Sequence, residues 1–280
     1  MAEAAQRLRQ MLNGPGMVVA PFVFDAFQAR IAQDTGFAAV YMTGFGTAAA
    51  RGFPDVGLLT MAEMVENVRY IASAVNLPLI CDADTGYGNP VNVYRTVREY
   101  EAAGAAALHI EDQVWPKRCG FLAGKQVIPL EEMVPKVQAA CDARRDGNFV
   151  IIARTDALAV NGWADVAKRA RAYRAAGADL IFVDGIRTLD DMQRYVQEIG
   201  DLPLLYNGQL LPVNDIEKMG FRLTIYSATL TGFYVRMRDM MRELRDTGSI
   251  TKSSMPGLFD EMTTLLGVKE ALALGKKYEH

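Results

Sequence analysis

The chain is 280 residues long, half of its residues are hydrophobic, and its formal net charge at pH 7 is −3. This composition supports a sizeable buried core and excludes an intrinsically disordered chain. The nearly balanced charge gives no sign of a surface that binds nucleic acid or a membrane. Basic residues gather near Arg236–Arg245, but acidic residues are interspersed with them, as on a solvated helix face. We therefore expect neither nucleic acid nor membrane as a partner.

The cysteines and the first residues of the chain bear on its compartment. Cys81, Cys119 and Cys141 are odd in number and lack the spacing of a zinc site, so we expect no disulfide framework. Reduced thiols fit a cytoplasmic environment. Met1–Gln10 carries no apolar signal core, and no apolar run is long enough to span a membrane. The sequence predicts a soluble, cytoplasmic protein.

Short apolar runs alternate with amphipathic segments along the chain. Eight runs are rich in Val, Ile, Leu, Ala or aromatic residues, as buried parallel strands are. They are Met17–Val23, Ala38–Met42, Leu77–Cys81, Ala105–Ile110, Phe149–Ala153, Leu180–Val183, Leu202–Tyr206 and Leu223–Tyr226. The helical segments between them include Asp25–Thr35, Met61–Val75, Val91–Ala103, Leu130–Arg145 and Trp163–Ala176.

This alternation predicts a (β/α)8 barrel. The competing doubly wound sheet would need a glycine-rich turn after its first strand, and Phe22–Ala26 contains no glycine. We predict a single barrel domain over residues 1–280, with a C-terminal helical extension over about residues 229–280. Within this extension, Thr229–Thr247 is predicted to be a long helix and Ser254–Leu274 to form two more helical pieces.

The extension carries more apolar side chains than an eighth barrel helix needs. They include Met237, Met240, Met241, Leu258, Leu265 and Leu266. Such side chains should be buried against a neighbouring subunit or, alternatively, against the same barrel as a C-terminal cap. The sequence leaves both alternatives open.

Acidic residues recur where the predicted strands end. In a (β/α)8 enzyme the working residues lie at the carboxyl ends of the strands. These ends are Tyr41–Gly44, Asp82–Asp84, His109–Asp112, Arg154–Asp156, Asp184 and Asn207. Acids brought together repel one another unless a cation neutralises them. Asp82, Asp84 and Glu111 therefore suggest a site for Mg²⁺, with Mn²⁺ as the alternative.

Other polar residues near these ends have competing interpretations. Asp55 lies in a Gly-Phe-Pro-Asp turn and is either a further acid of the site or a solvated turn residue. His109, within an apolar strand, is more typical of a hydrogen-bonded core residue than of a ligand. The Arg154 guanidinium needs an anion, either a substrate carboxylate or a nearby acid. Thr43–Gly46 offers backbone N–H groups, in a loop, to a substrate carboxylate.

The segment Ile110–Gly120 combines two chemistries. Glu111 and Asp112 are carboxylates at a strand end, and Cys119 follows Lys117 and Arg118. A thiol beside two cations should lose or donate its proton more readily than an ordinary buried thiol. The alternatives are a cysteine that acts as a small buried hydrophobe and a solvated loop.

These motifs together resemble the isocitrate lyase/phosphoenolpyruvate mutase superfamily along nearly the whole chain. The matching stretches are Tyr41–Gly44, Gly52–Asp55, Asp82–Gly88, His109–Gln113, Pro116–Gly120 and Ala153–Ala157. The Lys-Arg-Cys-Gly segment resembles the branch of 2-methylisocitrate lyases, 2,3-dimethylmalate lyases and the petal death protein. Gly124–Pro129 looks most like the dimethylmalate lyase and petal death group.

The resemblance implies roles for individual residues. Asp84 would bind Mg²⁺ directly, and Asp55, Asp82 and Glu111 would hold it through waters. Cys119 would be the general acid, Tyr41 the candidate base for the substrate hydroxyl, and Arg154 would stabilise developing charge, with Glu111 also in the catalytic group. The residues implied to contact substrate are Thr43, Gly44, Phe45, Asp82, Gly120, Phe121, Arg154, Asp184 and Asn207.

The implied reaction is the cleavage of a malate-like or isocitrate-like 2-hydroxy diacid. The C2–C3 bond would break to give a 2-oxo acid and a carboxylate enolate that Cys119 protonates, under a mobile loop. The substrate would thus be a di- or tricarboxylate. The resemblance also implies a homotetramer, built as a dimer of helix-swapped dimers.

Three residues depart from the lyase pattern. Phe121 stands where the lyases have histidine, Asp184 replaces a glutamate, and Gly208 follows Asn207 in place of an acidic turn. A less polar loop at Phe121 suggests a substrate with an apolar substituent. The same site could instead decarboxylate or hydrolyse an oxaloacetate-like 2-oxo diacid. A third alternative is a barrel that binds a 2-oxo acid without turnover.

Overall fold

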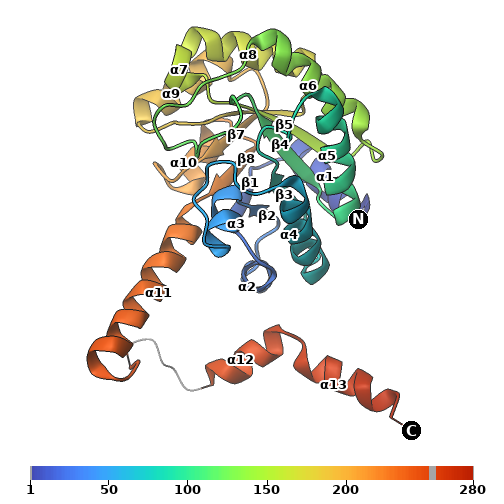
Figure 1. Cartoon of the computed structure of the whole chain (residues 1–280), viewed down its shortest axis with the longest axis vertical. Coiled ribbons are helices and arrows are strands. Elements are labelled where there is room, and N and C mark those ends of the chain that lie inside the picture. The colour runs from blue at the N-terminus through green and yellow to red at the C-terminus, as the bar shows by residue number, and fades with distance from the viewer. Residues whose placement is uncertain (1, 252–256, 280) are drawn as a thin grey trace.

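Eight parallel strands form a closed barrel in chain order, with each strand hydrogen-bonded to its sequence neighbours and β1 paired with β8 (Figure 1). The computed structural model describes residues 2–251 and 257–279. The strands are β1 Val18–Val23, β2 Val40–Met42, β3 Leu79–Asp82, β4 Ala107–Glu111, β5 Val150–Thr155, β6 Leu180–Val183, β7 Leu204–Asn207 and β8 Leu223–Tyr226. The predicted (β/α)8 barrel is confirmed, and every predicted strand boundary lies within two residues of the observed one.

Helices surround the barrel and join its strands. They are α1 Ala2–Asn13, α2 Ala26–Asp34, α3 Gly44–Ala50, α4 Met61–Ala74, α5 Pro90–Ala103, α6 Leu130–Ala143, α7 Leu158–Asn161, α8 Trp163–Ala175, α9 Leu189–Ile199 and α10 Val213–Lys218. Side-chain caps define several of their first turns. Thr60 at the start of α4 and Asn89 at the start of α5, for example, each form a reciprocal capping box.

Two layers of apolar side chains hold this architecture together. The outer layer lies between the strands and the helices and includes Val68, Val97 and Val137. The inner layer fills the barrel and includes Ile152 and Leu205. Leu8 and Leu12 of α1 join the inner layer, so α1 closes the amino-terminal end of the barrel. The carboxyl-terminal end is therefore the one left for a site.

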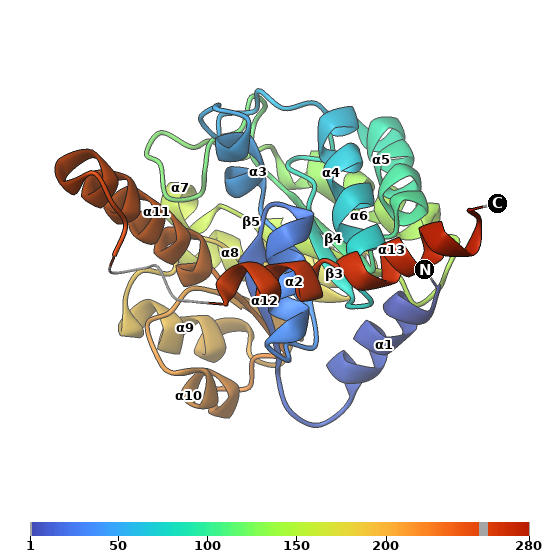
Figure 2. The same cartoon turned by 90° about the horizontal axis from the view of Figure 1, so that it is seen from below.

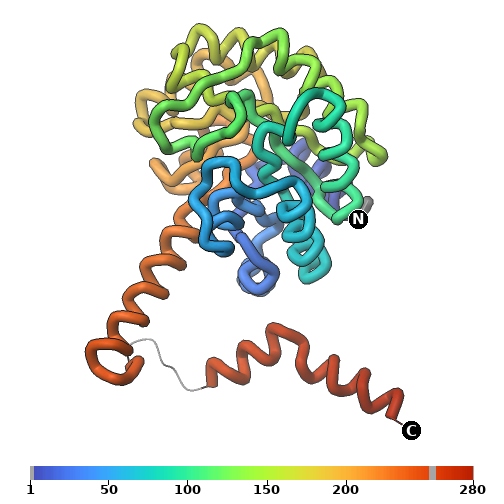
Figure 3. Tube along the Cα trace, viewed as in Figure 1, coloured from blue at the N-terminus to red at the C-terminus, as the bar shows by residue number. Residues whose placement is uncertain are grey.

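The C-terminal extension leaves the barrel. Helix α11, Ala228–Thr247, projects away from it, and α12 Leu258–Leu265 and α13 Val268–Lys277 lie beyond (Figures 1 and 3). Seen from below, α12 crosses α2 (Figure 2), where the Arg30 guanidinium donates to the Leu265 carbonyl at 3.1 Å. None of the three helices has a buried residue, so the cap on the same barrel is not what the chain forms.

The predicted excess of apolar surface on the extension is present and uncovered. Met241, for example, is 59% exposed and Leu266 is 45% exposed. Burial of these side chains against a neighbouring subunit stays a prediction. Within the described part of the chain, every helix is too short or too polar to cross a membrane.

Candidate active site

The carboxyl ends of the strands bring the predicted site residues to one rim of the barrel. Asp82 ends β3, Glu111 ends β4, Asn207 ends β7, and Asp184 directly follows β6. Arg154 is the last residue but one of β5. The side chains of Asp82, Glu111 and Asp184 are at most 7% exposed. The rim is therefore a dry site in which charges interact strongly.

Asp82 organises the backbone on the β2–β3 side of the rim. Its Oδ2 accepts from the Gly44 amide at 3.1 Å and its Oδ1 accepts from the Asp84 amide at 3.0 Å. Burial alone would raise the pKa of Asp82, but nearby positive charge, including Lys117, and the Asp84 amide lower it to about 2. Asp84 itself has φ 48°, a left-handed conformation that is uncommon for a residue with a side chain. Burial raises the pKa of Asp84 to about 6.

Lys117 lies between two of these acids. Its Nζ is 2.5 Å from Asp55 Oδ1 and 2.9 Å from Asp84 Oδ1, and its side chain is 3% exposed. Burial alone would lower the pKa of Lys117, but the surrounding carboxylates, led by Asp84, raise it well above its usual range. The turn acid Asp55 is thus part of the site. From its sequence position, Lys117 was expected to act on the neighbouring thiol, and its pairing with Asp55 and Asp84 was not predicted.

Arg154 is the centre of a second charged group. Its Nε and Nη2 donate to the two carboxylate oxygens of Asp156 at 2.9 and 3.1 Å. Nε is also 3.1 Å from Glu111 Oε2, and Nη2 is 3.3 Å from Asp184 Oδ2. Asn207 donates to Asp184 Oδ1 at 3.5 Å. Arg154 thus pairs with the acids of the rim, and its contact with a substrate carboxylate stays a prediction.

The loop between β4 and α6 covers this second group. The Gly120 carbonyl accepts from Lys125 Nζ at 2.6 Å, and the same Nζ donates to Asp156 Oδ1 at 2.7 Å. A Cβ at position 120 would lie 1.7 Å from Asp184 Oδ2, so only glycine fits this approach. Lys125 and Asp156 were missing from the predicted site. The signals that could have found them are the place of Asp156 at the end of the fifth predicted strand and the place of both residues in stretches that match the superfamily.

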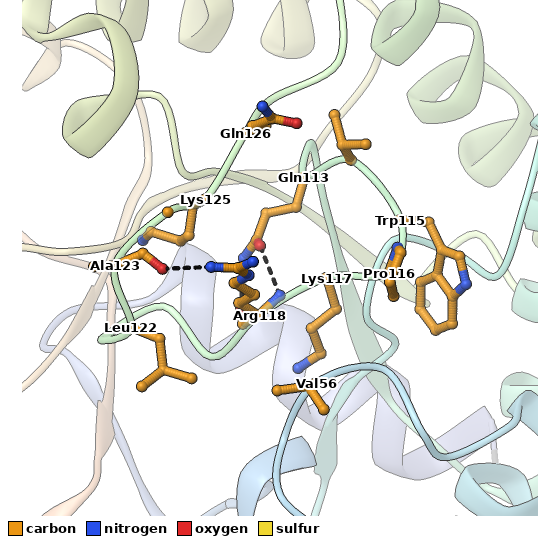
Figure 4. Close-up of a pocket in the computed structure, with 12 residues that line it drawn as sticks. Val56, Gln113, Trp115, Pro116, Lys117, Arg118, Leu122, Ala123, Lys125 and Gln126 are labelled. Carbon is orange, nitrogen blue, oxygen red and sulfur yellow. Dashed lines mark hydrogen bonds between the residues drawn. The ribbon is translucent and has the colours of Figure 1, made fainter.

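Cys119 lies on this loop between the two charged groups. Its amide donates to the Asp55 carbonyl at 3.0 Å, and its side chain is partly buried. Burial raises the pKa of the thiol. Arg154 and Lys117 lower it, whereas Arg118, its neighbour in sequence, donates to the Ala123 carbonyl at 3.0 Å (Figure 4). That the thiol gives up its proton more readily than an ordinary buried thiol stays a prediction. A thiol that keeps its proton at neutral pH can still act as an acid.

Tyr41 and His109 form a buried pair beside Asp82. The Tyr41 hydroxyl is 2.8 Å from His109 Nε2, which is 3.6 Å from Asp82 Oδ1. Burial lowers the pKa of His109 to about 4, so the imidazole is neutral at pH 7. Burial also raises the pKa of Tyr41 well above its usual range. His109 is therefore the hydrogen-bonded core residue that its apolar strand suggested.

The predicted carboxylate-binding loop Thr43–Gly46 is a helix start. Thr43 caps α3, and its side chain accepts from the Gly46 amide at 3.2 Å. The Gly44 amide is already bonded to Asp82. Two of the amides expected to face a substrate are thus used within the protein. Phe45, whose side chain is 46% exposed, lies at the edge of this turn.

Asp112, one of the two acids that ended the predicted fourth strand, does not belong to the metal group. Its Oδ2 accepts from the Thr155 and Tyr173 hydroxyls, both at 2.7 Å, and from Arg169 at 3.1 Å. Its Oδ1 accepts from the Asp156 amide at 2.9 Å. The carboxylate is therefore a buried structural hub. Successive side chains of a strand point to opposite faces, so Glu111 faces the barrel interior and Asp112 faces the helices.

Phe121 lies beside Arg187, a cation that was not among the predicted site residues. Its ring is 51% exposed, and the Arg187 guanidinium carbon lies 6.0 Å from the ring centre. Arg187 also donates to the Phe121 carbonyl at 3.1 Å. The aromatic ring thus lies under a guanidinium at the edge of the loop.

The rim has more carboxylates than cations, and this excess of negative charge suits a divalent cation. Among the described residues, three buried cations of the rim, Lys117, Lys125 and Arg154, lie near six carboxylates: Asp55, Asp82, Asp84, Glu111, Asp156 and Asp184. Glu111 Oε1 and Asn207 Oδ1 are buried without a hydrogen-bond partner among the described residues. No three acidic, histidine or cysteine side chains of the described chain, however, are arranged to ligate one metal directly. The donor set therefore fits a cation held by few direct ligands and otherwise by water.

A cavity of about 670 Å³ lies on the loop itself, not among the acids of the rim (Figure 4). Its lining includes Trp115, Arg118, Leu122 and Gln126. The Gln113 side chain crosses this region and bonds both backbone groups of Arg118, at 2.8 and 2.9 Å. The first half of the loop is therefore held to the barrel by its own hydrogen bonds.

A closed parallel barrel whose carboxyl-terminal rim gathers buried acids, cations and a thiol defines a (β/α)8-barrel enzyme. The family profile of phosphoenolpyruvate phosphomutase matches residues 8–245. The 2,3-dimethylmalate lyase of Eubacterium barkeri is 41% identical over 285 residues, covering 97% of this chain and 95% of that protein.

Two solved structures extend the comparison. Oxaloacetate acetylhydrolase in complex with 3,3-difluorooxalacetate has a TM-score of 0.91 at 36% identity, covering 99% of this chain and 97% of that one. Phosphonopyruvate hydrolase with oxalate and Mg²⁺ has a TM-score of 0.89 at 31% identity, covering 98% and 99%. The chain belongs to the isocitrate lyase/phosphoenolpyruvate mutase superfamily of enzymes, whose members include lyases, as its motifs predicted.

Proposed function

We propose that the protein is a Mg²⁺-dependent carbon–carbon lyase that cleaves a substituted malate or isocitrate-like 2-hydroxy diacid into a 2-oxo acid and a carboxylate. The observation that carries the proposal is the position of Cys119. It places a protonated thiol on a loop that is tied to Asp55 on one side and to the Arg154 group on the other. The similarity to a dimethylmalate lyase supports the same reaction.

The acidic half of the rim would hold the metal. Asp84 is the proposed direct ligand, and Asp55, Asp82 and Glu111 would hold the ion through waters, with Mn²⁺ as an alternative ion. When bound, Mg²⁺ would polarise the oxygens at C1 and C2 of the substrate as a Lewis acid. Lys117 lies within 2.9 Å of Asp84, and it would help to hold the substrate carboxylate on the same side.

Tyr41 is the proposed acceptor of the substrate hydroxyl proton. Because burial raises the pKa of Tyr41, its phenolate is too costly to form in advance. The phenol can accept the proton only if it passes its own proton on, and the neutral His109 Nε2 lies 2.8 Å away to receive it. As the hydroxyl is deprotonated, C2 becomes an oxo carbon and the electron pair of the C2–C3 bond moves to C3.

Cys119 and Arg154 act on the other product. The electron pair at C3 delocalises into the adjoining carboxylate, and the Arg154 guanidinium would stabilise that charge. Cys119 then donates its Sγ proton to C3. Thr43, Gly44, Phe45, Gly120, Phe121, Asp184 and Asn207 are the proposed contacts to the rest of the substrate. Phe121 suits an apolar substituent there.

A second candidate function uses the same site on a 2-oxo diacid. The structural likeness to oxaloacetate acetylhydrolase favours hydrolysis of oxaloacetate to oxalate and acetate. Decarboxylation of the same substrate to pyruvate is the related alternative. Both reactions would need the metal side of the rim, and in both the enolate left at C3 must take up a proton, for which Cys119 is the proposed donor.

We further propose that the active protein is a homotetramer built from helix-swapped dimers. The uncovered apolar faces of α11, α12 and α13 support exchange of these helices between subunits, because a single chain leaves them in water. Light scattering coupled to size-exclusion chromatography would give four times the 30.8 kDa chain mass if this is right. A monomer mass would contradict it.

Proton NMR of a pool of acids tests the reaction. The pool contains malate, citramalate, 2,3-dimethylmalate, isocitrate, 2-methylisocitrate and oxaloacetate, with enzyme and Mg²⁺ and then with a chelator. A 2-oxo acid appearing together with its matching carboxylate, only with metal, is the expected result. Loss of oxaloacetate alone would establish the second candidate, and any metal-dependent turnover would exclude a barrel that merely binds a 2-oxo acid.

A further inference from the structure

We propose that Lys125 is a positioning residue that fixes the Cys119 loop against Arg154. The role of Lys125 in catalysis rests on the proposed lyase function. Its effect on the position of the loop can be measured without any substrate. Lys125 lies on the same loop, directly after Gly124, and its side chain is 3% exposed. A lysine ammonium is rarely buried unless it is paired and hydrogen-bonded. Its contacts therefore indicate what it does.

The Lys125 ammonium joins the loop to the barrel. Nζ donates to the Gly120 carbonyl at 2.6 Å and to Asp156 Oδ1 at 2.7 Å, and it is 3.6 Å from Asp184 Oδ2. Gly120 directly follows the proposed acid Cys119 and is itself buried. The position of the thiol along the barrel rim thus depends on a hydrogen bond to the next residue.

Asp156 connects this lysine to Arg154. Its Oδ1 receives both Lys125 Nζ and Arg154 Nη2, while its Oδ2 receives Arg154 Nε. The Asp156 amide is in turn fixed by Asp112. One carboxylate therefore sets the distance between the loop that carries the acid and the guanidinium that stabilises the charge. A shift of either cation disturbs the other through this shared oxygen.

The contacts that hold the two halves of the loop are different. Gln113 fixes the backbone of Arg118, and Lys117 pairs with Asp55, so the first half is anchored independently of Lys125. Beyond Cys119, the exposed Arg187 donates to the Phe121 carbonyl, and the end of the loop is paired with its start, because Val114 donates to the Gln126 carbonyl and Ile128 to the Asp112 carbonyl. Lys125 is the cation that holds Gly120 between these two places. Without the Lys125 ammonium, the Gly120 carbonyl would face the Asp184 and Asp156 carboxylates. The loop would then move outward from the rim.

The test measures the accessibility of the Cys119 thiol in the absence of substrate. Lys125→Met removes the ammonium but keeps an unbranched side chain. Lys218→Met is the matched control, because Lys218 also pairs with an aspartate at 2.7 Å but is exposed. Each full-length variant is treated with iodoacetamide, and alkylation at Cys119 and Cys141 is followed by peptide mass spectrometry. Cys141 lies on α6, away from the loop, and is the internal reference.

The expected result is alkylation of Cys119 about tenfold faster or more in Lys125→Met, because a buried carbonyl without its donor favours the open loop. Cys141 should react at the wild-type rate, and Lys218→Met should match wild type at both cysteines. On a substrate found by NMR, kcat should fall at least about tenfold while KM stays within about twofold, since the metal side of the rim is intact.

Other outcomes separate the two proposals. A Cys119 rate within twofold of wild type, in a variant with unchanged circular dichroism, would overturn the positioning role. If Lys125→Met does not fold, Lys125→Ala, which likewise has no side-chain donor, must give the same acceleration. Failure of both to fold would make Lys125 a structural residue and overturn the inference. Faster alkylation of Cys119 in Lys125→Met, together with a wild-type enzyme that turns over none of the acids, would contradict the lyase proposal and leave the positioning role of Lys125 intact.

Discussion

Substituting Gly120 by alanine is the sharpest probe of the closed arrangement of the loop. An added Cβ would lie 1.7 Å from Asp184 Oδ2 and 2.7 Å from Arg154 Nη2. Ordinary van der Waals contact begins at 3.4 Å, so the Cβ and the carboxylate oxygen must separate by roughly 1.7 Å. Asp184 cannot easily yield, because Arg154, Lys125 and Asn207 surround its carboxylate. The loop must therefore move.

The expected loss of activity follows from that movement. Displacement of a reacting group by about 1 Å can cost about 10²-fold in rate. We expect kcat/KM of Gly120→Ala to fall at least about 10²-fold, or ~2.7 kcal/mol in transition-state free energy. The free energy of unfolding should fall by no more than about 1–3 kcal/mol, as for overpacking elsewhere.

The assay is kcat/KM at saturating Mg²⁺ on the acid that NMR identifies, with urea unfolding alongside. Gly147→Ala is the control, because a Cβ at position 147 would meet nothing within 4 Å. Its kcat/KM should equal that of wild type. If Gly120→Ala keeps kcat/KM within threefold of wild type, the packing of Gly120 on Asp184 is not part of the active enzyme. The reasoning about the loop would then fail.

Three further predictions concern the metal, the fold and the substrate. Chelation should abolish turnover, and added Mg²⁺ should restore it. Because burial raises the pKa of Asp84 to about 6, the Mg²⁺ affinity measured by calorimetry should fall as the pH drops through 6. A Mg²⁺ affinity that stays constant from pH 8 to pH 5 would count against Asp84 as a ligand. Asp112→Ala should lower the free energy of unfolding in urea by about 3–5 kcal/mol, because it leaves buried donors without an acceptor. Asp201→Ala, which breaks an exposed pair with Arg171, should leave the free energy of unfolding nearly unchanged. Phe121→His should raise turnover of unsubstituted diacids; no rise would remove the support for an apolar substituent.

Much of the fold could be read from local patterns. Each strand is an apolar run long enough for one barrel strand, and β6 and β8 begin and end where the sequence predicted. The Asp82–Asp84 and Arg154 positions followed from the rule that barrel sites lie at strand ends. These predictions succeeded because burial on both sides forces the strands to be continuously apolar, so any polar residue at their ends is conspicuous.

The partners of the charged residues could not be read in this way. Sequence adjacency suggested that Lys117 and Arg118 both act on Cys119, but in the fold Lys117 pairs with Asp55 and Asp84, and Arg118 turns away. Adjacent residues in an extended loop point in opposite directions, and the charge that a side chain meets comes from distant strands. Burial, which raises the pKa of the thiol, is likewise a property of the whole fold.

The sequence by itself determined the barrel, the superfamily and the acids, the arginine and the thiol that meet at its carboxyl-terminal rim. Only the tertiary structure decided that Asp112 is a structural hub while Glu111 enters the site, and that Lys125 and Asp156 join the loop to Arg154. The physical reason is that the type and spacing of secondary-structure elements follow from local chain geometry. The pairing of charged side chains depends instead on which strand ends the closed barrel brings within hydrogen-bonding distance.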